Sequence, residues 1–214
     1  MASISSLSNN ILKVVDFSKV TSAEIASLTS AQISVLSTAQ TSAITTSAIS
    51  SISTAAIANL STSQIYALIT SQIAYLSTDQ LVALGTAQAA ALTSAQVNAI
   101  GATNIATMET ADIAALSTAG VAGLSTAEMV ALTTDQLVGL STAQAAALTS
   151  AQASVITGAK LATMETADIA ALSTAAVASL TTSQITSLST DQLASLTTIQ
   201  AAALTTAQIQ ALIS

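Results

Sequence analysis

The chain lacks five amino acids altogether: proline, cysteine, histidine, tryptophan and arginine. Charged residues make up 6% and aromatic residues 1% of its 214 residues. Without cysteine there is no disulfide framework and no thiolate chemistry. Without histidine the chain has neither the commonest metal ligand nor the commonest general base, and a serine or threonine nucleophile needs such a base. The composition therefore predicts that the protein is not an enzyme and that it uses no cofactor or metal.

Charge is scarce and mostly negative. Ten acidic residues stand against Lys13, Lys19 and Lys160, which gives a net charge of -7. Nucleic-acid binding needs a basic surface that displaces counterions, so the charge balance excludes nucleic acid as a partner. No stretch approaches the roughly 18 consecutive apolar residues of a membrane helix, because serine, threonine or glutamine interrupts the pattern every few positions. We therefore expect no membrane span.

What the chain does have is a strict period of eight. From Val20 to Leu212 every eighth residue is a large apolar one, which gives 24 octads without an insertion or deletion. The octad follows the template L-[ST]-T-A-Q-I-x-A, with positions numbered 1 to 8 from the leucine. Such regularity predicts a solenoid in which each unit stacks on its neighbours. Positions 1 and 6 carry the expected core and stacking residues, among them Leu28, Leu60, Ile65, Leu84, Leu140, Leu172 and Leu204.

A second period of 56 residues, or seven octads, lies on top of the first. Residues 78–124 closely match residues 134–180, and the sequence METADIAALSTA occurs in both. This period indicates an internal duplication, or a length that approximates a whole number of superhelical turns.

The octad fits one short helix better than the other regular structures. In a continuous helix the apolar stripe would rotate by about 80° per octad and wind around the whole surface. Within one octad, a hydroxyl at position 2 and glutamine at position 5 form a capping box, and positions 1 and 6 form a hydrophobic staple. Ser61 with Gln64, and Ser141 with Gln144, are such capping pairs. The sequence predicts an all-α solenoid with one short helix per octad, packed on one another because such helices are unstable alone.

Three points remain open. A β-solenoid is the competing fold, because threonine recurs at position 3, although alanine and glutamine are poor strand residues. The second point is the register of the cap. Position 3 is serine or threonine even more regularly than position 2, so an N-cap one residue later is the alternative. The glutamine at position 5 would be either half of the capping box or part of a solvent-facing ladder.

The two ends differ from each other. Residues 1–19 depart from the octad and form an expected degenerate N-terminal cap, while residues 20–214 form the octapeptide-repeat solenoid. The C-terminal sequence QIQALIS keeps full repeat character, so we expect this end to stack on another copy or on neighbouring repeats. The N-terminus lacks a basic segment followed by an apolar one, so we expect no Sec signal peptide.

Some residues invite a chemical interpretation. Glu109 and Asp112, with their copies Glu165 and Asp168, occupy the N-cap and N3 positions of their octads. There their negative charges would interact favourably with the helix dipole. Alternatively, the pair would bind calcium or act as an acid and a base. The larger side chains at position 7 would line a binding face of the solenoid: Tyr66, Val82, Asn98, Val130 and Gln210.

The phrase L-[ST]-T-x-Q-[IV]-x-A-L, as in LSTDQLVAL at 76–84 and LTTAQIQAL at 204–212, resembles repeats of very large bacterial surface proteins. These are described as adhesins or as haem utilisation or adhesion proteins. The resemblance covers nearly the whole chain and implies export by a non-Sec route, extracellular or cell-surface display, and a spacer or matrix role. It carries over no functional residues.

Together these observations predict a structural protein that self-associates into a fibre, or that forms the stalk of a bacterial surface or matrix protein. Its partners would be copies of itself, stacked head to tail, or neighbouring repeats. The alternative is a binding module whose groove holds a peptide, a glycan or an apolar ligand.

Overall fold

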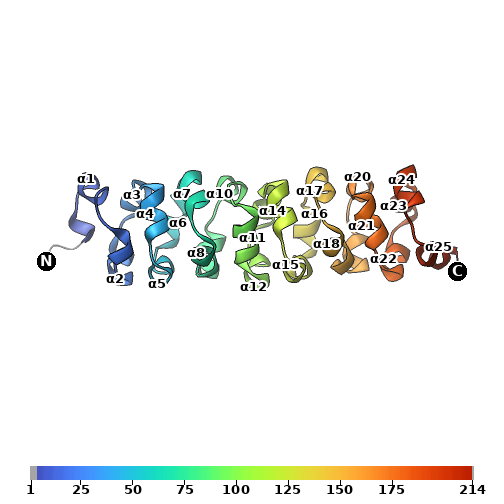
Figure 1. The fold of residues 1–214 in the computed structure, drawn as a ribbon, viewed down its shortest axis with the longest axis horizontal. Coiled ribbons are helices and arrows are strands. Elements are labelled where there is room, and N and C mark those ends of the chain that lie inside the picture. Colours follow the sequence, from blue (N-terminus) through green and yellow to red (C-terminus); the bar gives the residue numbers. More distant parts are fainter. Residues whose placement is uncertain (1–3, 214) are drawn as a thin grey trace.

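The computed structural model describes residues 4–213, and these residues form a rod of short helices (Figure 1). The two termini lie at opposite ends of the rod, and the helices follow one another along its axis in sequence order (Figure 1). Among residues 4–213 there are 25 α-helices and two 3-10 helices and no strand. The predicted all-α solenoid is therefore confirmed, and the β-solenoid alternative is wrong.

Each octad from Thr21 onward contributes one helix of four to eight residues. The N-terminal third contains η1 (Ile4–Ser6), α1 (Asn9–Leu12), η2 (Phe17–Lys19), α2 (Ser22–Ser27), α3 (Ser30–Ser34), α4 (Thr38–Ala43), α5 (Thr46–Ile49), α6 (Thr54–Ala58), α7 (Thr62–Ala67) and α8 (Thr70–Ala74). The middle contains α9 (Thr78–Val82), α10 (Thr86–Ala90), α11 (Ser94–Ile100), α12 (Ala102–Ile105), α13 (Thr110–Ala115), α14 (Thr118–Gly123), α15 (Thr126–Ala131), α16 (Thr134–Val138) and α17 (Thr142–Ala146). The last part contains α18 (Ser150–Val155), α19 (Gly158–Leu161), α20 (Thr166–Ala171), α21 (Thr174–Ser179), α22 (Thr182–Ser187), α23 (Thr190–Ala194), α24 (Thr198–Ala202) and α25 (Thr206–Ile213).

The N-cap lies at position 2 of the octad, and the first helical residue follows at position 3. Ser61 has an extended backbone and its hydroxyl accepts a hydrogen bond from the N–H of Gln64, while the Gln64 side chain accepts from the N–H of Ser61. The helix ends at the next position 1, where Leu68 returns to an extended backbone (ψ 134°) and its N–H donates to the carbonyl of Ile65. Each octad thus contains the N-cap of its own helix, and the position-1 residue of the next octad ends that helix.

From α2 onward, each helix packs most closely on a helix three octads before or after it. Examples are α4 on α7, α7 on α10, α10 on α13 and α13 on α16. These pairs join successive turns of a superhelix that has between three and four octads per turn. Helices seven octads apart, such as α10, α17 and α24, lie along the same edge of the rod (Figure 1). The 56-residue period therefore matches a whole number of turns.

Positions 1 and 6 build one continuous hydrophobic core from Ile4 to Leu188. Burying a leucine or isoleucine side chain contributes about 1.5–3 kcal/mol, and this packing lets helices exist that are too short to form alone. Of the predicted core residues, Leu28, Leu60, Ile65, Leu84, Leu140 and Leu172 are at most 5% exposed. Leu204 lies in the last turn and is only partly buried, because no later octad of this chain covers it.

The N-terminal segment follows the same superhelix in degenerate form. Its described part contains η1, α1 and η2, and η1 packs on α2 while η2 packs on α4, the same step of three elements. Leu12 and the only phenylalanine, Phe17, are fully buried there. Residues 1–3 of the predicted cap, and residue 214, lie outside the described residues. None of the helices between residues 4 and 213 has the length and apolar character to cross a bilayer.

Candidate functional site

The most distinctive polar feature of the rod is internal. We call the position-5 side chains the glutamine column, because 14 of the 24 octads carry glutamine there. All 14 are at most 9% exposed: Gln32, Gln40, Gln64, Gln72, Gln80, Gln88, Gln96, Gln136, Gln144, Gln152, Gln184, Gln192, Gln200 and Gln208. The predicted solvent-facing ladder is therefore wrong, since a buried amide must find its partners inside the protein.

Each glutamine acts on two turns at once. The Oε1 atom of Gln80 accepts the N–H of Ser77 at 2.8 Å, which closes the cap of its own helix. Its Nε2 donates to the carbonyls of Ile49 at 3.0 Å and Ile52 at 2.7 Å, which lie 31 and 28 residues earlier. From Gln40 onward every glutamine of the column donates to the position-1 carbonyl 28 residues before it. The column therefore joins each turn to the preceding one by hydrogen bonds.

Each capping pair expected from the sequence has its glutamine in this column. Ser61 and Gln64 form a capping box, and Gln64 also donates to the carbonyls of Ile33 and Leu36 at 3.0 Å each. Ser141 and Gln144 do the same, with Gln144 donating to the Leu116 carbonyl at 2.7 Å. Sequence reasoning missed the second role of these amides. The signal was the preference for glutamine over glutamate, since glutamate completes a capping box equally well but has no N–H to donate.

Where the column lacks glutamine, the chain uses other solutions. Lys160 occupies the column in α19, and its Nζ donates to the carbonyls of Val130 and Leu132, 30 and 28 residues earlier. Four octads have a residue too small to reach another turn: Ala48, Ala56, Gly120 and Ala176. Asn104 turns back and donates from Nδ2 to the Ile100 carbonyl of its own octad at 3.1 Å.

Glu128 shows what happens when a buried column residue can only accept. One carboxylate oxygen takes the N–H and hydroxyl of Ser125 at 2.8 and 2.7 Å. The other accepts the N–H of Gly101, 27 residues earlier, at 3.0 Å. Gly101 has φ 82°, the only positive φ among the described residues, and this conformation favours glycine. The preceding turn thus presents a donor where it elsewhere presents a carbonyl.

The acidic pair Glu109 and Asp112 differs from its copy, Glu165 and Asp168, in the hydrogen bonds of the aspartate. Asp168 and Asp112 are both buried in the column. Asp168 accepts the hydroxyl of Thr142 at 2.8 Å, whereas the Oδ2 of Asp112 is buried without a hydrogen-bond partner. Burial, and to a smaller extent the negative charge of Glu109, raise the pKa of Asp112 to about 6.

The neighbouring glutamates do not complete these pairs into a metal site. Glu109 and Glu165 stand at the N-caps of α13 and α20, and neither side chain bonds to the helix amides. Among residues 4–213 no three carboxylates come together in a way that would hold a metal ion.

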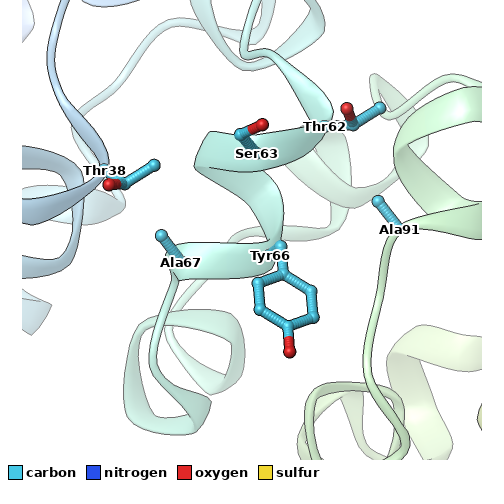
Figure 2. Close-up of a pocket in the computed structure, with 6 residues that line it drawn as sticks. All are labelled: Thr38, Thr62, Ser63, Tyr66, Ala67 and Ala91. Carbon is cyan, nitrogen blue, oxygen red and sulfur yellow. The ribbon is translucent and has the colours of Figure 1, made fainter.

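The exposed position-7 residues lie on the outside of the rod, and one of them lines a groove. The groove has a volume of about 540 Å³ and is open to solvent. It is lined by Tyr66, by the small apolar residues Ala67 and Ala91, and by Thr38, Thr62 and Ser63, and the Tyr66 ring points away from Thr62 and Ser63 (Figure 2). No charged side chain lines it. Val82, Asn98, Val130 and Gln210 are exposed elsewhere, and Asn98 donates to the Gly123 carbonyl at 3.3 Å.

Comparison with known proteins supports the repeat assignment. A family model described as the ALTTAQ repeat matches residues 70–102, 105–142 and 161–198, which together make up just over half of the chain. No curated protein matches the chain.

Proposed function

The chain belongs to the ALTTAQ repeat family, and we propose that its function is structural: it forms a rod that serves as a fibre unit or as the stalk of a bacterial surface or matrix protein. The glutamine column is the observation that carries this proposal. Because each amide bonds the preceding turn as well as its own helix, neighbouring turns cannot slide or separate without losing buried hydrogen bonds. A spacer or fibre needs this resistance along its axis.

The scarcity of lysine and arginine supports a role outside the cell, as the resemblance to surface-protein repeats implies. Trypsin cleaves after these residues, and two of the three lysines lie in the first 19 residues. The third, Lys160, has its Nζ on the carbonyls of Val130 and Leu132. Limited trypsin digestion is therefore expected to leave residues 20–214 as one fragment, while rapid cleavage after Lys160 would contradict a rigid rod.

The two end turns offer different surfaces to a partner. On the last turn Ile199 and Ile213 are 71% and 81% exposed, and the carbonyls of Leu188 and Leu196 receive no glutamine amide. The first turn has Ser8, Asp16 and Glu24 at the positions of the column, and none of these carries an amide donor. A head-to-tail joint between copies would thus lack the glutamine bonds of the interior. Neighbouring repeats that carry glutamine at position 5 fit the last turn better.

Electron microscopy over a range of concentrations tests the proposal. Single rods of uniform length at every concentration would support the stalk, whereas filaments that lengthen with concentration and have a regular axial repeat would support the fibre. Compact or irregular particles in place of rods would overturn both.

A second function, ligand binding, is favoured by one observation, the groove at Tyr66. An exposed aromatic ring beside small apolar residues and hydroxyls, without charge, suits a neutral ligand that has an apolar face, such as a sugar ring.

Titration of the protein with cellotetraose and maltotetraose, followed by NMR of the tyrosine rings, tests this second function. Shifts at Tyr66 that disappear in Tyr66→Ala and persist in Tyr75→Ala would support binding. An unchanged spectrum with both sugars would count against this ligand class.

A further inference from the structure

Asp112 departs further from the hydrogen-bonding pattern of the column than any other residue. It stands at position 5 of its octad, in α13, and is 2% exposed. Its Oδ2 is the one buried side-chain oxygen or nitrogen among residues 4–213 that has no hydrogen-bond partner. A buried carboxylate without a donor costs several times more than an unmet neutral group, so its environment favours a proton.

The register of the column makes Asp112 the counterpart of the glutamines that bond the preceding turn. Glutamines of the column donate to carbonyls 28 and 31 residues earlier, and for Asp112 these positions are Leu84 and Leu81. A carboxylate cannot donate to a carbonyl, but a protonated carboxyl has one O–H that can. The proton would therefore replace the amide hydrogen that the other octads supply.

No positive charge compensates Asp112. On its own element the nearest titratable group is Glu109, whose charge also opposes ionisation. The helix α10, packed on α13 from the preceding turn, contains no titratable residue, and α16, packed from the following turn, carries only the exposed Asp135. In the copy, Asp168 avoids the problem because the Thr142 hydroxyl donates to it at 2.8 Å, whereas Thr86 makes no such bond to Asp112.

We propose that Asp112 is a proton-operated latch between the turn of α10 and the turn of α13: protonated, it bonds the preceding turn as a glutamine does, and ionised, it loosens this one seam of the rod. The seam is suited to such a role because four successive octads, with Asn104, Asp112, Gly120 and Glu128 in the column, contain no glutamine. These four octads span slightly more than one superhelical turn, so the latch is not bypassed by neighbouring glutamines.

The sign of the pH effect follows from the raised pKa of about 6. The folded state binds the proton more tightly than the unfolded chain, whose aspartate pKa is about 3.9, so the seam gains stability as pH falls from above 6 towards 4. Local opening of α13 should become roughly tenfold rarer between pH 7.5 and pH 5, by the same linkage relation.

Native-state hydrogen exchange of the full chain tests the latch at the amides of Ile113 and Leu116, whose N–H groups bond within α13. Protection factors, corrected for the intrinsic pH dependence of exchange, should rise about tenfold from pH 7.5 to pH 5. In Asp112→Asn, which has an amide at every pH, this rise should vanish. The matched variant Asp168→Asn should retain it.

Direct titration of the Asp112 side-chain carboxyl by carbon NMR gives an independent reading that requires no variant. A midpoint near 6 is expected. A midpoint near the ordinary aspartate value, or protection at α13 that is flat with pH in the unmodified chain, would overturn the proposal. A pH-dependent rise that persists unchanged in Asp112→Asn would also overturn it.

Discussion

Residues 78–124 and residues 134–180 are nearly the same sequence in two successive parts of one rod, yet their glutamine columns differ. Most of the substitutions between them fall in 97–105 and 153–161. Just after the second copy, Gln184 donates to the carbonyls of Ala153 and Ile156 within it, and Thr157 caps α19 with an ordinary backbone (φ −64°). Just after the first copy the equivalent residue is Glu128, and it accepts the N–H of Gly101, which has φ 82°.

The residue in the column and the backbone of the turn before it match as donor and acceptor in both cases. When the amide nitrogen of glutamine is replaced by a carboxylate oxygen, the Ile100 carbonyl loses its donor from the next turn. Asn104 then supplies a donor to that carbonyl, α11 extends to Ile100, and Gly101 directs its N–H to Glu128. The fold tolerates either solution as long as donors and acceptors match across the seam.

The largest effect should be the same in both copies, because the apolar frame is common to them. Leu84→Ala and Leu140→Ala each remove a side chain that is 3% exposed, so each should lower the free energy of unfolding by about 3 kcal/mol. Urea unfolding followed by circular dichroism measures this. Val82→Ala, at a 39% exposed position, is the control and should change little. A clear difference between the two leucine variants would mean that the copies do not share one core geometry.

A substitution at Gly101 tests the backbone conformation that only the first copy has. Gly101→Ala places a Cβ at φ 82° and should cost about 2 kcal/mol of unfolding free energy. Gly85→Ala is the matched control, because Gly85 has φ −96° and a Cβ there would meet nothing within 4 Å. It should be neutral or stabilise slightly, since alanine restricts the unfolded chain. Equal losses in the two variants would rule out the backbone conformation as the cause.

How much of this was accessible from sequence depends on whether the interaction lies within one octad or between turns. The capping box of Ser61 and Gln64 and the burial of positions 1 and 6 recur in most octads, so the motif records them. The step of three helices per turn is set by contacts between octads that are not adjacent, and no single octad encodes it. The conformation of Gly101 was equally hidden, because its cause, Glu128, lies 27 residues away.

Lys160 offers a weaker contrast between the copies, since its counterpart is Asn104. Lys160→Met keeps the length of the side chain but removes the ammonium that bonds Val130 and Leu132. The site is partly exposed, so the loss of a charge-assisted hydrogen bond should cost about 1.5 kcal/mol. Lys13→Met, at an exposed lysine, removes the same charge and should have almost no effect. If both variants lose the same stability, the effect reflects net charge and not the column.

The finest contrast concerns one hydroxyl. Thr142→Val removes the donor to Asp168 and leaves that buried carboxylate in the situation of Asp112, which should cost about 1 kcal/mol at pH 7.5. Thr86→Val makes the same change in the first copy, where the hydroxyl has no bond to Asp112, and should cost almost nothing. Urea unfolding of both variants at this pH measures the difference. If Thr86→Val were as costly as Thr142→Val, the hydroxyls would act on their own helices alone. A cost confined to Thr142→Val would show that a hydroxyl from the preceding turn stabilises the buried Asp168 in the second copy. In the first copy no such hydroxyl bonds Asp112, and protonation of its carboxyl takes that role.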